Sequence, residues 1–254
     1  MRLRVFAGPN GSGKSTVIQY VRNYKTSNGK IDFGYYINAD DLAWLLKKGP
    51  FNFSQYDITV DFELFKNVAI ASGLINVNFQ EEIFLKSFKL VDNQLTLIDL
   101  KSVEQLAQIL ADFLRKQLLD EKKRFSFETV FSHTSKLDIM QEAKARGYKV
   151  YLYFVSTETP EINKARVLSR KAQGGHDVPP DKIESRYERS LDLLYEACQL
   201  AYQVFFFDNS SEGKESNMFA HFKMVNGKKK WDELKKEDIP SWFIKYYLEK
   251  IPRK

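Results

Sequence analysis

A chain of 254 residues with 43% hydrophobic and 28% charged side chains is long enough to bury a core, and its composition excludes a disordered or fibrous protein. The formal net charge of +6 at pH 7 suits an anionic partner, which could be a nucleotide, a nucleotide-sugar or nucleic acid. The single cysteine, Cys198, excludes a disulfide framework and lies in an apolar run, so we expect it in the core.

The first predicted elements enclose a glycine-rich turn. Residues 3–7 form a short apolar run with β-branched and aromatic members, which predicts a buried strand. Residues 14–25 carry apolar side chains at helical spacing. A second short strand is predicted over residues 35–38, and a helix with one apolar face over residues 40–48. The order is therefore strand, glycine-rich turn, helix.

The middle of the chain is predicted to be mainly helical. Residues 57–74 form one predicted helix, and residues 102–123 form a longer one with a continuous apolar stripe. Between them, residues 75–100 alternate apolar and polar side chains in places, which favours a small β insertion over a separate domain.

The second half returns to alternating strands and helices. Strands are predicted over residues 124–130 and 149–155, and helices over residues 137–145, 162–171 and 181–201. Strands that alternate with helices at this spacing imply βαβ units. They therefore predict a parallel sheet with helices on both faces.

A last core strand is predicted over residues 203–208, and the tail after it has a different pattern. Residues 218–231 hold an Asn-Gly pair between alternating segments, which predicts a β-hairpin, and residues 239–251 form an amphipathic helix. We expect an α/β fold with a parallel sheet. Its predicted parts are a P-loop kinase-like domain over residues 1–213, the small insertion near 75–100, and a C-terminal appendage over residues 214–254.

The segment GPNGSGKS matches the phosphate-binding pattern G-x-x-x-x-G-K-[ST]. Glycines let backbone N–H groups approach the phosphates without a Cβ in the way, and the following helix adds its partial positive charge. Lys14 can reach the β- and γ-phosphates, while the Ser15 hydroxyl joins the Mg²⁺ shell. We predict a site for ATP or GTP with Mg²⁺, contacted by Gly8, Asn10, Gly11, Ser12, Gly13, Lys14, Ser15, Thr16 and, beyond the last core strand, Asn209.

Carboxylates lie at the ends of two predicted strands: Asp40 and Asp41 after YYIN, and Glu128 within SFET. Ligands of open α/β sheets bind outside the carboxyl ends of the strands, so these side chains are candidates for the metal and substrate. Asp40 is either a functional carboxylate or the N-cap of its helix, and Asp41 is a first-turn acid. No ABC-type signature is present, which argues against an ABC motor.

Four arginines flank the loop QGGHDVPP, and two of them are four residues apart on one helix face. A mobile segment that bears arginines can close over the charge that develops on a transferred phosphoryl group. Alternatively, these arginines form surface salt bridges with Glu161, Glu184 and Glu188. His176 either donates a hydrogen bond to phosphate or braces the loop. The four arginines are Arg166, Arg170, Arg186 and Arg189.

On these residues the chain resembles the zeta-toxin family and its chromosomal relatives. The matching segments cover about 150 residues in family order and include GPNGSGKST, YYINADDLA, AIASG, FSFETVFS, KARVLSRKAQGGHDVPPDKIESRYERSLDLL and FFFDNS. The resemblance implies a P-loop kinase. The toxins of this family phosphorylate the 3′-hydroxyl of UDP-N-acetylglucosamine, which implies a UDP-N-acetyl sugar as the substrate.

The resemblance also implies roles for individual residues. Asp40 falls on the family's catalytic base, close to the metal that Ser15 binds, and Arg170 on the first lid arginine. Glu128 and Thr129 fall on the family's substrate-sugar contacts. From their positions in the sequence, Asp41, His176 and Arg186 are further candidates for substrate contacts. The second lid arginine has no clear equivalent, since His176 stands in that region, and Gly73 is followed by Leu74 where many relatives have an A-G-R triplet.

We therefore expect a kinase that phosphorylates a small hydroxyl substrate, with Lys14, Asp40 and Arg170 as the catalytic residues. Two alternatives stay open: a P-loop ATPase that drives a conformational switch in a protein or nucleic-acid complex, and a polynucleotide kinase. An antitoxin protein is an implied partner, whereas nucleic acid is not expected. The sequence has no run of the ~18 apolar residues that a membrane span needs and too short an apolar start for a signal peptide, so we expect a cytoplasmic protein without membrane contact.

Overall fold

The computed structural model of the chain describes residues 1–27, 29–174, 178–211 and 217–252. Within it the chain divides into two compact units. The first contains residues 1–33 and 128–254, and the second contains residues 34–127.

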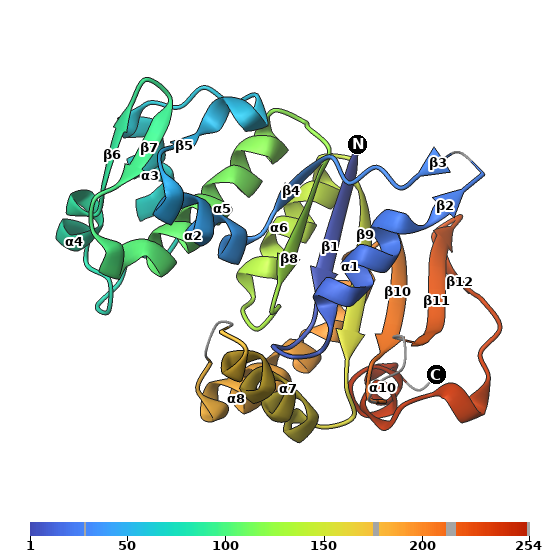
Figure 1. Cartoon of the computed structure of the whole chain (residues 1–254). Coiled ribbons are helices and arrows are strands. Elements are labelled where there is room, and N and C mark those ends of the chain that lie inside the picture. The colour runs from blue at the N-terminus through green and yellow to red at the C-terminus, as the bar shows by residue number, and fades with distance from the viewer. Residues whose placement is uncertain (28, 175–177, 212–216, 253–254) are drawn as a thin grey trace. The chain divides into compact units, whose positions relative to one another are not determined.

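The first unit is built on a mainly parallel sheet (Figure 1). Its parallel strands are β1 (Arg2–Ala7), β9 (Lys149–Ser156) and β10 (Gln203–Asp208), paired in the order β1-β9-β10. Their register places Phe6, Tyr153 and Phe205 side by side. All three strands are rich in buried aromatic and β-branched residues, as strands with helices on both faces require.

Two antiparallel strands extend this sheet beyond β10 and confirm the predicted hairpin. They are β11 (Asn217–Val225), which pairs with β10, and β12 (Lys228–Trp231), which pairs with β11. Asn226 and Gly227 form the turn, and both have positive φ angles, 49° and 75°, as a two-residue hairpin turn of this kind demands.

Six helices accompany this sheet among the described residues of the first unit. The first, α1, follows the glycine-rich turn, while the last, α10, packs its aromatic side chains on Phe206 of β10. A short hairpin of β2 (Lys25–Thr26) and β3 (Gly29–Lys30) follows α1. The helices are α1 (Lys14–Asn23), α6 (Ser135–Ala145), α7 (Pro160–Ala172), α8 (Pro180–Asp192), α9 (Leu194–Leu200) and α10 (Ser241–Tyr246).

The second unit pairs β4 (Tyr35–Ile37) in parallel with β8 (Phe125–Thr129), whose last two residues belong to the first unit. Its longest helix, α5 (Val103–Asp120), contributes Phe113 to a cluster of rings with Phe53 and Phe65. The other elements are α2 (Ala39–Lys48), β5 (Phe51–Asn52), α3 (Phe62–Ile70), α4 (Glu81–Lys86), β6 (Phe88–Val91) and β7 (Gln94–Leu97), in which β5, β7 and β6 form an antiparallel sheet.

The predicted α/β fold is confirmed, but three predicted elements are wrong in part. The helix expected over residues 57–74 is confined to α3, because Asp57 adopts a left-handed conformation and the Asp61 side chain caps the helix by accepting from the N–H of Leu64. The segment 75–100 is not all β, since EEIFLK forms α4 before the β6–β7 hairpin. The helix expected over residues 181–201 divides at Leu193 into α8 and α9.

The terminal helix is also shorter than predicted. It comprises α10 and then a 3₁₀ turn over Leu248–Lys250. Cys198 is fully buried, which confirms its place in the core, and burial raises the pKa of its thiol well above the usual range. Among the described residues, no helix is long and apolar enough to cross a membrane.

Candidate functional site

Three glycines shape the turn between β1 and α1. Gly8, Gly11 and Gly13 have φ angles of 147°, 77° and 94°, in the region that favours glycine. A Cβ on Gly8 would lie 2.0 Å from the carbonyl oxygen of Val155, and one on Gly13 would lie 2.0 Å from Nδ2 of Asn209. The turn therefore requires glycine for both its conformation and its packing, and we call residues 8–15 the cradle.

The Lys14 side chain folds back over the cradle. Its ammonium group donates to the carbonyl oxygens of Gly8 and Pro9, each at 3.0 Å, and lies 3.9 Å from Oε1 of Glu128. Only 8% of the residue is exposed. The structure thus brings together Lys14 and Glu128, two of the predicted site residues, and holds the lysine charge where a phosphate would meet it.

Asn209 ties the cradle to the end of β10. Its Nδ2 donates to the carbonyl oxygen of Ser12 at 2.9 Å, and its backbone N–H donates to Ser156. The guanidinium of Arg166 donates to the carbonyl oxygen of Asn209 at 2.7 Å. Asn209 therefore lies at the cradle as predicted, and Arg166, expected among the lid arginines, instead supports it through that carbonyl.

Several polar atoms at the cradle have no hydrogen-bond partner in the described part of the chain. Oδ1 of Asn10, Oγ of Ser12 and Nδ2 of Asn163 are buried and unsatisfied, a state that is costly unless a ligand or water supplies the partner. Ser15 and Thr16 are exposed in the first turn of α1, which contains no acidic residue. These features fit a nucleotide whose phosphates meet the N-terminus of α1.

A metal at this site would depend on the nucleotide for much of its coordination. No group of three or more His, Cys, Asp or Glu side chains in the described residues could hold a metal ion. Mg²⁺ usually keeps several waters and takes one or two protein ligands together with phosphate oxygens. The Ser15 hydroxyl suits such a role.

Two arginines on α7 and α8 have no partner among the residues that the structure describes. The guanidinium of Arg170 is exposed, and neither it nor that of Arg186 makes an ion pair or hydrogen bond with the residues that the structure describes. Burial, and then repulsion from Arg189, lowers the pKa of Arg186. A half-buried cation such as Arg186 favours a bound anion.

The sequence left open that the four arginines form surface salt bridges with nearby glutamates. For two of these glutamates the partner is a lysine. Glu161 and Glu184 pair with Lys164, at 3.8 and 2.5 Å, and not with an arginine. Arg189 donates to the carbonyl oxygen of Ser185 within its own helix. His176 falls outside the described residues.

In the second unit, Asp40 lies in the first turn of α2. The N-cap is Asn38, whose side chain accepts from the N–H of Asp40 at 2.9 Å, so the alternative interpretation of Asp40 as the cap is wrong. Asp40 is exposed, and its carboxylate has no hydrogen-bond partner in the described ranges. Asp41 is also exposed, and its charge adds to the effect of burial in raising the pKa of Tyr56 to about 12.

At the end of β8, the hydroxyl of Thr129 bonds to the backbone that follows it. Its Oγ1 accepts from the N–H of Phe131 at 3.1 Å, and Phe131 is buried with a left-handed φ of 61°. Glu128 precedes it with 16% of its side chain exposed. The two predicted substrate contacts are thus adjacent on a constrained chain segment, and Glu128 is the one beside Lys14.

A polar network that the sequence did not predict joins the C-terminal segment to the loop that carries Asn209. Nε1 of Trp242 donates to Asp208 at 2.9 Å, and the hydroxyl of Ser210 donates to the same carboxylate at 2.8 Å. Ser210 in turn accepts from the N–H of Glu158, whose carboxylate accepts from the N–H of Ser241 at 3.0 Å. Residues 241–242 therefore fix the chain just beyond β10.

Comparison with known proteins yields one family match. Residues 100–212 match the family model described as Zeta toxin. A protein of Haemophilus influenzae, itself described as uncharacterized, is 35% identical over 63 residues, which cover 25% of this chain and 45% of that protein. The alignment therefore spans less than half of that curated relative.

Two solved structures match most of this chain at low sequence identity. A chain of the AvrRxo1-ORF1:AvrRxo1-ORF2 complex with sulphate ions gives a TM-score of 0.49 at 17% identity, over 90% of this chain and 60% of that one. A chain from the PezAT chromosomal toxin-antitoxin system of Streptococcus pneumoniae gives 0.44 at 16% identity, over 82% of this chain and 69% of that one.

Proposed function

Since residues 100–212 make this a zeta-toxin-like chain, we propose that it transfers the γ-phosphoryl group of ATP to a hydroxyl group of a small substrate. The observation that carries the proposal is the cradle itself. Its glycines leave no room for a Cβ, Lys14 is held over it, and Asn10 and Ser12 hold buried polar atoms that lack a partner in the described part of the chain. These are requirements for binding a triphosphate.

Each residue of the site has a part in the proposed reaction. The N–H groups of the cradle and the ammonium of Lys14 bind the β- and γ-phosphates. The Ser15 hydroxyl would hold Mg²⁺, which would supply positive charge against the phosphate oxygens. Asp40 accepts the proton of the acceptor hydroxyl. At the same time the hydroxyl oxygen of the acceptor bonds to the γ-phosphorus, and the bond between the γ-phosphorus and the leaving oxygen of ADP breaks. Arg170 stabilises the charge on the transferred group.

The proposed acceptor is a UDP-N-acetyl sugar, bound by Glu128 and Thr129 with Asp41, His176 and Arg186. The position of Glu128 beside Lys14 supports this part of the proposal, because a substrate contact must lie next to the γ-phosphate. An antitoxin protein as partner, and residues 1–213 as the kinase domain with residues 214–254 as its appendage, are further parts of the proposal.

The test is a transfer assay. The chain is incubated with Mg²⁺, ATP or GTP, and a panel of UDP-sugars, and mass spectrometry measures which acceptor gains one phosphate. We expect a UDP-N-acetyl sugar to gain it from ATP, and the Lys14→Ala variant to serve as the blank. Turnover of ATP that no sugar accelerates would favour an ATPase, and labelling of a 5′-hydroxyl oligonucleotide in place of any sugar would favour a polynucleotide kinase.

A further inference from the structure

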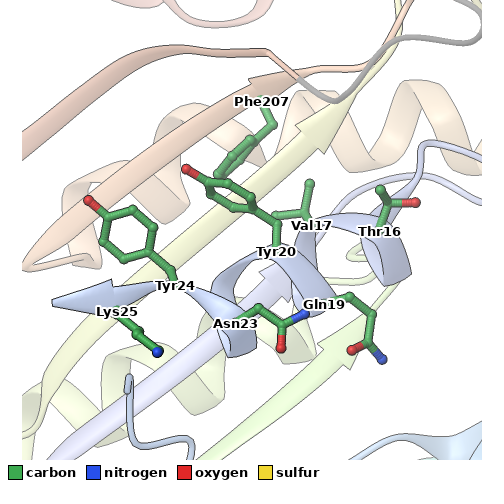
Figure 2. A pocket seen from close by; sticks show the side chains of 8 residues that line it. All are labelled: Thr16, Val17, Gln19, Tyr20, Asn23, Tyr24, Lys25 and Phe207. Atoms are coloured by element: carbon green, nitrogen blue, oxygen red, sulfur yellow. The ribbon is translucent and has the colours of Figure 1, made fainter. Parts of the chain in front are cut away.

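One face of the sheet in the first unit carries an open groove beside α1. A cavity of about 650 Å³ lies between the outer side of α1 and β10. Figure 2 shows the rings of Tyr20 and Tyr24 projecting from the same side of α1, with the ring of Phe207 close to that of Tyr20. The lining residues are Thr16, Val17, Gln19, Tyr20, Asn23, Tyr24, Lys25 and Phe207.

Aromatic rings continue from this groove across the strands. Tyr20 and Tyr24 are each 50% exposed, and their ring centroids are 5.9 Å apart. On the strands, the half-buried ring of Phe205 stacks on Tyr153 at 4.7 Å and on His221 at 4.6 Å. The exposed rings are therefore those of Tyr20 and Tyr24, whereas Tyr153 is buried and Phe205 is only half-buried.

Exposed lysines lie on the same surface, two of them against a further ring, that of Tyr202. The ammonium of Lys149 lies 4.9 Å from the ring centroid of Tyr202, and that of Lys223 lies 5.8 Å from the same ring. Lys25 lines the groove, and Lys230 is paired with Lys223 in the β11–β12 register. All four lysines are exposed.

Carboxylates are almost absent from the elements that form this surface. The segments β1, α1, β2, β3, β9, β11 and β12 contain no Asp or Glu, and β10 contains only Asp208, which is bonded to Trp242 and Ser210. Asp232, just after β12, is paired with His221 at 2.8 Å. A surface of one charge sign attracts a partner of the opposite sign.

We propose that this face binds single-stranded nucleic acid. Exposed rings set among lysines on an open sheet suit this partner, because bases stack on aromatic side chains while lysines contact the phosphates. An acidic protein segment would match the charge but would not need ring faces between the lysines. The proposal runs against the expectation from the sequence that nucleic acid is not a partner, and it does not depend on the proposed kinase activity.

The test measures binding of a fluorescently labelled poly(dT) or poly(U) oligonucleotide by anisotropy, without ATP, over a range of salt concentrations. We expect the double variant Lys149→Glu/Lys223→Glu to weaken binding at least about tenfold and to flatten the dependence of log K on log salt by about one unit per lysine. The control is Lys89→Glu/Lys101→Glu, which changes the net charge equally at exposed lysines of the second unit and is expected to bind like the parent.

A second variant tests the rings. We expect Tyr20→Ala/Tyr24→Ala to weaken binding by roughly 10- to 100-fold with little change in the salt dependence, since stacking is not ionic. Circular dichroism confirms that each variant is folded. No binding at low salt, or equal weakening by both lysine pairs, would overturn the proposal. Tight binding of polyglutamate that the tyrosine variant retains would assign the face to an acidic protein instead.

The result is separable from the kinase proposal. The Lys14→Ala variant is expected to bind the oligonucleotide like the parent, because Lys14 is buried and does not line the groove. Absence of sugar phosphorylation would leave this binding unchanged. Conversely, loss of oligonucleotide binding in the lysine pair with unchanged sugar phosphorylation would confirm that the face acts independently of the cradle.

Discussion

In the cradle, the protein already bonds the charged side chain that a phosphate would meet, whereas at the end of α7 the guanidinium of Arg170 has no partner among the described residues. Lys14 is buried and donates to two backbone carbonyls, and Asn209 is fixed from both sides by Ser12 and Arg166. Arg170 is exposed, like Asp40 in the second unit. The groups proposed to bind the nucleotide are therefore preorganised, whereas Asp40 and Arg170, which are proposed for the chemistry, have no partner among the described residues.

The largest effect is expected from Lys14→Ala. The change removes the one ammonium held over the cradle, so phosphoryl transfer is expected to fall by about 10³-fold or more, with weaker nucleotide affinity. β1 stays buried, so the fold is retained. The measurements are ATP turnover and nucleotide titration, and turnover at the parent rate would show that the cradle is not the active site.

Asp40→Asn tests an exposed carboxylate that has no hydrogen-bond partner among the described residues. Because Asn38 caps α2, the change is expected to leave the melting temperature and ATP affinity close to the parent. Transfer is expected to fall by roughly 10²- to 10⁴-fold, because an amide cannot accept the hydroxyl proton.

Two companion variants sharpen that measurement. Asn38→Ala removes the cap and is expected to lower stability by ~1 kcal/mol. An active Asp40→Asn beside an inactive Asp41→Asn would move the base by one residue. Full activity in both would refute the mechanism proposed here.

Arg170→Ala is expected to lower kcat by about 10²-fold with little change in nucleotide affinity, since a lid arginine acts on charge formed in the transition state. Arg189→Ala is the control, because Arg189 already bonds within its own helix and should be near neutral. A purely thermal effect of Arg170→Ala would give it a structural role.

The sequence predicted features that depend on neighbouring residues and missed features that depend on residues far along the chain. The cradle follows from local rules, since its glycines are required by their own φ angles, and the sequence located it correctly. The helix expected over residues 57–74 failed because of a distant residue. Nδ2 of Asn93 donates to the carbonyl oxygen of Ile58 and its Oδ1 accepts from the N–H of Val60, which holds that stretch in a non-helical conformation.

The candidate site shows the same limit. Helical spacing places Arg166 and Arg170 on one face of α7, so the sequence does not distinguish them. They differ because Arg166 donates to the carbonyl oxygen of Asn209, far along the chain, whereas Arg170 has no partner among the described residues. The bond between Trp242 and Asp208 has no local signal either. Motifs identify groups that contact ligands, whereas the residues that hold those groups in place depend on tertiary contacts.

Gly13→Ala tests the packing of the cradle. The left-handed conformation alone costs about 1–2 kcal/mol for a residue with a Cβ. The new methyl group would also displace Asn209 from Ser12, and nucleotide affinity is expected to fall about tenfold or more. Gly147→Ala is the matched control, since Gly147 has a φ of 79° with nothing within 4 Å of its Cβ position. Equal nucleotide affinity in the two variants would mean that the contact with Asn209 is unimportant.

Arg166→Ala is expected to give the smallest effect on chemistry and to separate support from catalysis most cleanly. The charged hydrogen bond to the Asn209 carbonyl contributes about 1.5–3 kcal/mol, so its loss is expected to lower the melting temperature and to weaken nucleotide binding by roughly tenfold as Asn209 becomes less well fixed. At saturating ATP, kcat is expected to stay within a few-fold of the parent, because the role passes through Asn209 and not through the transferred group. We therefore expect opposite results for the two arginines, which are one turn apart on the same helix. Arg166→Ala weakens nucleotide binding and lowers the melting temperature, whereas Arg170→Ala lowers kcat; nucleotide titration, thermal melting and kcat measure the difference. If Arg166→Ala instead lowers kcat with unchanged nucleotide affinity, Arg166 is itself the lid arginine. The contrast between the hydrogen-bonded cradle and the end of α7 then does not hold.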